Sequence, residues 1–151
     1  NMDRYTLNKN AEGYTDLTAL EGIKRADKGK TNKPKTTEAQ EQKSLIEWAK
    51  WQEKKYPELK LLYHCPNGGT RNKMEAANLK RQGVKAGVPD LFLPVPRGNS
   101  HGLFLEMKVG RNKCTDNQKK WIRALMEQGY EVKVCYSAEE AIQIIKRYLG
   151  I

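Results

Sequence analysis

The amino-acid sequence predicts a mixed α/β domain in which a central sheet is flanked by helices. Three observations support this prediction. Stretches with a helical apolar stripe alternate along the chain with short apolar strands. Two of these strands are separated by only a short turn, so they are expected to pair antiparallel. Capping residues and glycines also mark the ends of most elements. The expected core order is α-β-β-β-α-β-α.

Length and composition set the domain organisation. The chain has 151 residues, which suits one domain with a real core, expected over residues 37–151. Residues 1–36 are polar and basic, and they are predicted to form a flexible arm. The three cysteines are odd in number and form no CxxC pair, so we expect reduced thiols rather than disulfides or a zinc site.

The charge of the chain indicates the class of partner. The net charge is +10 and the sequence pI is near 9.5, which favours a polyanion, most simply nucleic acid. The alternative is an ordinary basic surface. No apolar run approaches the roughly 18 residues of a membrane span, and no signal-peptide pattern is present. We therefore expect a soluble, cytoplasmic protein.

The first half of the domain is predicted to contain two helices and a strand. Thr37 is a suitable N-cap for the first helix, and Pro57 ends it. Gly83 ends the second helix, which is basic. The expected elements are a helix over 37–55, a strand over 59–64, a glycine-rich loop over 65–69 and a helix over 72–82.

The second half is predicted to contain a hairpin followed by a helix, a strand and a helix. Thr115 caps the first of these helices and Gly129 closes it, while Ser137–Glu140 reads as a capping box. Pro94 and Pro96 cannot donate to a ladder and can shift its register by a bulge. The expected elements are strands over 91–95, 103–109 and 131–136, a turn over 97–102, and helices over 115–128 and 138–149.

An acid precedes one strand of the hairpin, and an acid and a lysine lie on the other. Glu106 and Lys108 are two apart, so they point to the same face, and folding the hairpin places Asp90 roughly opposite Lys108 and Val109. Two carboxylates and the main-chain carbonyl of Met107 can bind a hard divalent cation. The alternatives are an ordinary turn for Asp90 and a solvated ion pair on the strand. Together the residues predict a metal-dependent nuclease site.

Other polar residues are candidates for supporting roles. Lys108 is expected to orient the attacking water or to neutralise charge on the scissile phosphate. Gln118 lies on the apolar stripe of its helix, so it needs a partner, either the active-site water, Lys108 or the helix start. Glu38 and Glu41 both lie in the first turn of the first helix, where acids are ordinary, and spacing alone does not choose between them.

Basic residues cluster between the glycine-rich loop and Asp90. We interpret them as contacts to the phosphate backbone leading into the site, with a solvated helix face as the alternative. His64 and His101 are isolated, and we assign neither a role. The candidate DNA-binding residues are Asn67, Arg71, Lys73, Lys80, Arg81 and Lys85.

Taken in order, these motifs resemble the VRR-NUC (virus-type replication-repair nuclease) family, within the PD-(D/E)xK restriction-endonuclease-like superfamily. The resemblance covers residues 37–149. It rests on Glu38 with Gln42 and Trp48, Pro66–Gly69 with Arg71, Gly87–Asp90, Glu106–Lys108, Gln118, Gly129–Val134 and Ser137–Ala141.

The resemblance implies a restriction-endonuclease-like fold and a Mg²⁺- or Mn²⁺-dependent nuclease. Asp90, Glu106 and Lys108 would be catalytic, with Gln118 as the family's glutamine after the second motif. It also implies an acid from the first helix as a further metal ligand. Glu38 matches better by its spacing to Gln42 and Trp48, and Glu41 is the alternative.

The chain is similar to the stand-alone members of the family found in phages and prophages. Those members resemble Holliday-junction resolvases, which act as homodimers on branched DNA, and a two-fold dimer presents two equivalent sites to a four-way junction. The sequence thus predicts a structure-selective DNA endonuclease. A monomeric flap or nicking nuclease and a catalytically silent nucleic-acid-binding module are the alternatives.

Overall fold

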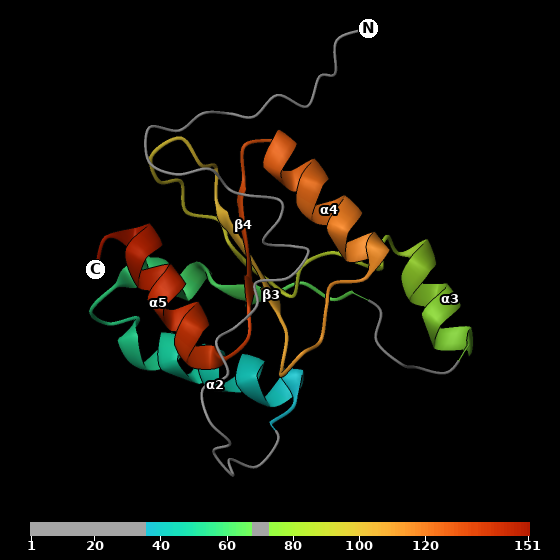
Figure 1. Ribbon diagram of the computed structural model, residues 1–151, viewed down its shortest axis with the longest axis horizontal. Helices are drawn as coiled ribbons and strands as arrows, with labels where there is room; N and C mark the ends of the chain where they lie inside the picture. The colour runs from blue at the N-terminus through green and yellow to red at the C-terminus, as the bar shows by residue number, and fades with distance from the viewer. Residues whose placement is uncertain (1–35, 68–72) are drawn as a thin grey trace, which may run out of the picture. The chain divides into compact units, whose positions relative to one another are not determined.

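The computed structural model describes residues 36–67 and 73–151 (Figure 1). The predicted N-terminal arm, apart from Thr36, and the candidate Arg71 lie outside the described residues. The elements in order are α2 (Glu38–Gln52), the 3₁₀ helix η1 (Pro57–Leu61), β1 (Tyr63–His64), α3 (Lys73–Arg81), β2 (Leu91–Leu93), β3 (Leu103–Met107), α4 (Asp116–Glu127), β4 (Glu131–Cys135) and α5 (Ala138–Leu149).

The four strands form one mixed sheet in the order β1-β2-β3-β4. The pairs β1–β2 and β2–β3 are antiparallel, as expected for the hairpin, and β3–β4 is parallel because α4 carries the chain back to the same end of the sheet. The order of helices and strands confirms the predicted α/β class.

One face of the sheet packs in the hydrophobic core, and the other carries Glu106. Leu103, Leu105 and Met107 of β3 are buried in a core with Leu45 of α2 and Ile145 of α5. The alternate residues of β3 point to the other face, where α4 packs through its buried Ile122. Figure 1 shows α2 and α5 on one side of β3 and β4, and α4 on the other. The face under α4 is the one that carries Glu106.

Three local predictions need correction. Residues 59–61 belong to η1 rather than to a strand, because Pro57 at its first turn favours a helical start. The strand expected over 91–95 ends at Leu93, before Pro94, which cannot donate to the ladder. The strand expected over 103–109 ends at Met107.

The register of the hairpin also differs from the prediction. Leu91 pairs with Leu105, so the ladder continues with Asp90 opposite Glu106 rather than opposite Lys108 or Val109. Two features cause the difference. The chain takes one more residue from Leu93 to Arg97 than its partner takes from Ser100 to Leu103, and the turn closes at Arg97 and Ser100 rather than spanning 97–102. In this register the charge of Asp90 acts on Glu106.

The predicted helix caps hold, with one exception. Thr37 and Thr115 each accept a backbone hydrogen bond and complete capping boxes with Gln40 and Gln118. Ser137 accepts from the backbone N–H of Glu140, but the Glu140 side chain accepts from Tyr136 instead of Ser137. The predicted box at the start of α5 is therefore only half formed.

Two expectations from composition can be compared with the described residues. The three cysteines, Cys65, Cys114 and Cys135, are buried and free, as predicted. Within residues 36–67 and 73–151, every helix is too short or too polar to cross a membrane.

Candidate active site

Asp90 is held by contacts from three directions. Its Oδ1 accepts a hydrogen bond from Asn67 Nδ2 at 3.0 Å, and its Oδ2 accepts one from the Met107 N–H at 2.8 Å. Its main-chain carbonyl accepts from the Cys65 N–H at 2.8 Å and lies 2.8 Å from His64 Nδ1. These contacts fix the carboxylate against β3, beside Glu106.

The loop before Asp90 touches the first turn of α4. Gly87 has a φ of +92°, and a Cβ built there would lie 2.8 Å from the carbonyl carbon of Asn117. Only glycine allows both this backbone conformation and this close approach. Because Gln118 follows Asn117, the contact ties the position of Asp90 to that of Gln118.

Glu106 is fully buried, with 0% of its surface exposed, and its two oxygens differ. Oε1 accepts hydrogen bonds from Lys108 Nζ at 2.7 Å and from Gln118 Nε2. Oε2 has no hydrogen-bond partner among the described residues. Buried polar atoms are nearly always paired, so this oxygen is suited to a ligand.

The Gln118 side chain makes one hydrogen bond at the start of α4 and another in the site. Its Oε1 accepts from the Thr115 N–H at 2.8 Å and completes the capping box of α4, while its Nε2 donates to Glu106. The sequence predicted a partner in the site or at the helix start, and the structure gives both. The partner in the site is Glu106, not Lys108.

The charges around Glu106 are unbalanced. Burial and the neighbouring Asp90 charge raise the pKa of Glu106 to about 7, although the Lys108 hydrogen bond opposes them. Burial lowers the pKa of Lys108, but the hydrogen bond to Glu106 and the charges of Glu106, Glu38 and Asp90 outweigh it, so that pKa is raised. Lys108 supplies one positive charge, and it is surrounded by three acids, Glu106, Glu38 and Asp90. The site therefore has fewer positive than negative groups.

The two first-turn acids of α2 point to different places. Glu38 Oε2 lies 3.8 Å from Lys108 Nζ, and its Oε1 accepts from Asn112 Nδ2 at 3.0 Å. Glu41 Oε2 accepts from the Ala138 N–H at 2.7 Å, at the start of α5. Glu38 therefore faces the site, and Glu41 caps a helix.

The family resemblance implies a metal ion, and the donor set allows a test of fit. Among residues 36–67 and 73–151, no three Asp, Glu, His or Cys side chains converge as a metal-binding group. Asp90 and Glu106 are close enough for the charge of Asp90 to raise the pKa of Glu106, and Glu106 Oε2 has no hydrogen-bond partner among the described residues. Two carboxylates and a main-chain carbonyl are hard oxygen donors, so these residues fit Mg²⁺ or Mn²⁺.

The predicted basic residues lie on exposed segments that precede Asp90 in the chain. Helix α3 has no buried residue, and Lys73, Lys80 and Arg81 are exposed on it, as is Lys85 in the following loop. Asn67, predicted to contact DNA, donates to Asp90, and its contact to DNA stays a prediction.

Sequence reasoning missed the contacts of Asn112 and His64. Asn112 bonds to Glu38 across 74 positions of sequence, and His64 lies against the main chain of Asp90 rather than against its carboxylate. No local spacing signals a contact between residues so far apart. The sequence placed His64 at the end of a predicted strand over 59–64 but did not indicate that this strand pairs with β2.

Comparison with known proteins gives a consistent result. The VRR-NUC domain model matches residues 33–139. A solved structure described as a VRR_NUC domain protein is 34% identical to this chain, covers 78% of it and 91% of its own length, and aligns with a TM-score of 0.66. Comparison with curated proteins gives no match. The matched range runs from before Glu38 to beyond Gln118, and the chain therefore belongs to the VRR-NUC domain family, whose nuclease-type domains process nucleic acid.

Proposed function

We propose that this protein is a metal-dependent, structure-selective DNA endonuclease that cuts four-way junctions as a homodimer. The observation that supports this most is the buried Glu106, whose Oε2 has no partner among the described residues and which lies beside Asp90. A module that only binds DNA gains nothing from two acids brought together in a chain of net charge +10. Such acids are useful to a nuclease that holds a cation against a phosphate.

The proposed metal ligands are Asp90, Glu106 and the main-chain carbonyl of Met107. When bound, Mg²⁺ or Mn²⁺ lowers the pKa of a water molecule and stabilises negative charge on the phosphate. Gln118 and Lys108 both bond to Oε1 of Glu106, so they orient the carboxylate and leave Oε2 for the cation.

Lys108 and Glu38 complete the proposed site. Lys108 is buried and its ammonium holds its proton, which suits a group that orients water or stabilises charge on the phosphate. Glu38 is the further acid that we propose from α2, and its pairing with Lys108 and Asn112 brings it to this edge of the site. The attacking water forms the new bond to phosphorus as the leaving oxygen departs, with no covalent intermediate on the protein.

The proposed substrate follows from charge and assembly. The exposed cations of α3 and Lys85 lie on the segment that leads to Asp90, so they can contact the backbone of the strand to be cut. A homodimer would present two equivalent sites, which suits paired cuts in the opposed strands of a four-way junction.

Cleavage of labelled DNA tests the proposal directly. Four-way junction, flap and linear duplex DNA are incubated with Mg²⁺ or Mn²⁺ and with wild type, Lys108→Ala or Lys50→Ala, an exposed control lysine of α2. We expect paired symmetric nicks in the junction, lost in Lys108→Ala and kept in Lys50→Ala, from a protein that light scattering shows to be a dimer.

Other outcomes separate the alternatives. Cutting of flaps by a monomer would retain the site but replace the junction assignment with a flap nuclease. Binding of DNA without metal-dependent cutting of any substrate would overturn the nuclease proposal in favour of a binding module.

A further inference from the structure

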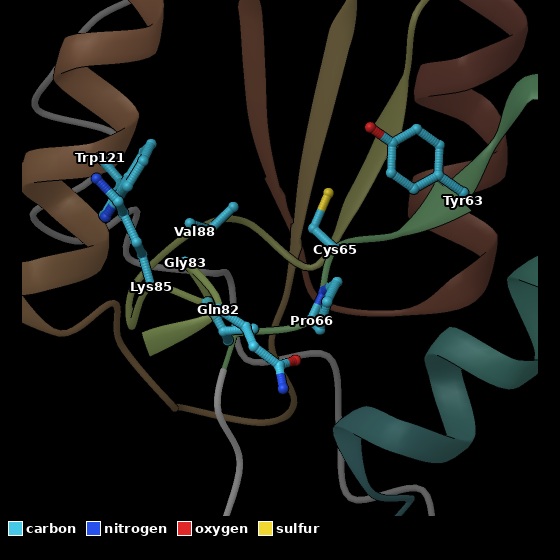
Figure 2. Close-up of a pocket in the computed structure, with 9 residues that line it drawn as sticks. Tyr63, Cys65, Pro66, Gln82, Gly83, Lys85, Val88 and Trp121 are labelled. Atoms are coloured by element: carbon cyan, nitrogen blue, oxygen red, sulfur yellow. The ribbon is translucent and has the colours of Figure 1, made fainter. Parts of the chain in front are cut away.

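A cavity of about 460 Å³ opens between β1, the loop after α3 and α4. Figure 2 shows Trp121 of α4 and Tyr63 of β1 at its opposite ends, with Val88, Cys65 and Pro66 between them. The volume lies within the range of about 300–1,000 Å³ that is usual for small-ligand pockets. The cavity contains neither Glu106 nor Lys108 in its lining, so it is separate from the proposed cleavage site.

The cavity lies on the same face of the sheet as Glu106. The ring of Tyr63 packs edge-on against Phe92, with centroids 5.9 Å apart, and Phe92 stacks on Phe104 at 4.0 Å. Phe104 is two residues before Glu106 in β3, so both side chains point to this face. The aromatic rings beside the cavity and the Glu106 carboxylate therefore lie on one face of the sheet.

The cavity also adjoins Asp90 along the chain. Cys65, in the cavity wall, donates its N–H to the Asp90 carbonyl at 2.8 Å. Val88, another wall residue, precedes Asp90 by two positions. A strand whose phosphate lies at Asp90 and Glu106 would thus have an adjacent nucleotide at the mouth of this cavity.

The lining matches one chemical group of DNA. Two aromatic side chains, Tyr63 (50% exposed) and the half-buried Trp121, offer surfaces for stacking. Gln82 supplies an amide that can bond to a polar edge, and Lys85 supplies an exposed cation for a phosphate. Among the lining residues that the structure describes, none is acidic. Flat apolar surfaces, one amide and one cation suit a nucleobase and its phosphate.

We propose that this cavity binds a single unstacked nucleobase next to the scissile phosphate. The inference rests on the proposed nuclease function and adds a reason for structure selectivity. A base paired within a continuous duplex cannot enter the cavity without the free-energy cost of unstacking, and this cost is smallest at a branch or an unpaired position. The enzyme would then select DNA by the availability of a displaced base.

A substrate–enzyme double-mutant cycle tests this assignment. The preferred DNA is prepared intact and with one abasic nucleotide at each position around the cut. Cleavage is measured for wild type, Trp121→Leu and Tyr63→Leu, with Trp51→Leu as the matched control. Trp51 is 84% exposed on α2 and lies outside the cavity lining.

The proposal makes a quantitative expectation. Removing the base at one position lowers wild-type kcat/KM by about tenfold, and Trp121→Leu lowers it on intact DNA by about the same factor. The two changes combined lower it no further, because each removes the same contact. Trp51→Leu gives wild-type rates on every substrate. Urea unfolding checks that the variants are folded, and if Trp121→Leu unfolds, the half-exposed Tyr63→Leu decides the cycle.

The contrary results are distinct. If abasic positions have no effect on the wild type, or if their effects multiply with those of Trp121→Leu, the cavity does not hold a base although the enzyme is a nuclease. If Trp121→Leu cuts normally but no longer dimerises, the cavity receives a second copy of the chain instead. If the wild type cuts none of the DNA substrates, the proposed function itself fails, and this inference with it.

Discussion

At the scale of single residues, the pair formed by Glu106 and Lys108 is expensive to bury. The side chains of Lys108 and Glu106 are 6% and 0% exposed, and one carboxylate oxygen has no partner among the described residues. Replacing such a buried pair with apolar groups is often neutral or stabilising. Its presence beside Asp90 is therefore better understood as a requirement of chemistry than of folding.

Gln118 allows a test that separates positioning from capping. Gln118→Ala removes both of its hydrogen bonds, whereas Gln118→Glu keeps an oxygen for the Thr115 N–H and loses the donor to Glu106. We expect both variants to cut DNA at least about tenfold more slowly, since neither orients Glu106. Gln118→Ala should also lose about 0.5–1 kcal/mol of stability from the cap, measured by urea unfolding, whereas any loss of stability in Gln118→Glu would come from the carboxylate placed against Glu106.

Gln118→Glu separates the two roles, because orienting Glu106 requires the amide donor and capping α4 requires only the oxygen. If Gln118→Glu cuts DNA at the wild-type rate, the residue acts only as a helix cap, and its bond to Glu106 has no part in the reaction.

At the scale of elements, the two acids in the first turn of α2 have different roles. Glu41 contacts the start of α5, and Glu38 contacts Lys108 in the site. We expect Glu41→Ala to lower the free energy of unfolding by about 1–2 kcal/mol, because the Ala138 N–H at the start of α5 loses a charged acceptor. Cleavage at a temperature where the variant is folded should stay near wild type. Glu38→Ala should do the reverse, with little change in unfolding and reduced cleavage. Denaturant curves and cleavage rates are measured for both variants. A slower cleavage by Glu41→Ala, or a loss of stability in Glu38→Ala, would contradict this assignment.

The contact between the loop before Asp90 and α4 gives a second prediction at this scale. In Gly87→Ala the added Cβ would lie 2.8 Å from Asn117 backbone, so the loop or the helix start must shift. Gly98 also has a positive φ, of +54°, but a Cβ there meets nothing within 4 Å. We expect Gly98→Ala to cost about 1 kcal/mol and to cut normally.

Gly87→Ala should cost more than this control and should also reduce cleavage, because the shift moves Asp90 relative to Gln118. Equal unfolding midpoints and equal rates for the two variants would show that the close approach is not needed.

At the scale of the whole molecule, the sequence predicted what depends on local patterns. Periodicity, capping residues and glycines located α2, α4, β4 and α5 to within a few residues. The predicted proximity of Asp90, Glu106 and Lys108 followed from the hairpin alone.

Features that depend on tertiary contacts were beyond such reasoning. One residue of the change in register arises from a bulge at the prolines, and the rest arises from a turn that closes at Arg97 and Ser100; no local pattern specifies either. The choice between Glu38 and Glu41 required knowing that α5 begins beside α2, since both acids have ordinary first-turn positions. The pairing of Glu38 with Asn112 likewise joins segments that the sequence leaves unrelated.

The shortage of positive charge at the site leads to a prediction about the stability of the whole fold. A cation that binds Asp90 and Glu106 only when they are brought together stabilises the folded state by mass action, by about 2.7 kcal/mol at one hundred times its dissociation constant. Mn²⁺ should therefore raise the unfolding temperature of the wild type, and EDTA should reverse the effect. Asp90→Asn should abolish the rise, because it removes one of the two converging charges.

Asp116→Asn is the matched control, since this acid is 91% exposed on α4 and pairs with Lys119. It should show the full wild-type rise with Mn²⁺. Differential scanning fluorimetry at several metal concentrations measures all three proteins without DNA and without turnover. An equal rise in wild type and Asp90→Asn would place the cation elsewhere on the protein, and no rise in any of them would mean that these acids bind metal only once a DNA phosphate supplies further oxygens.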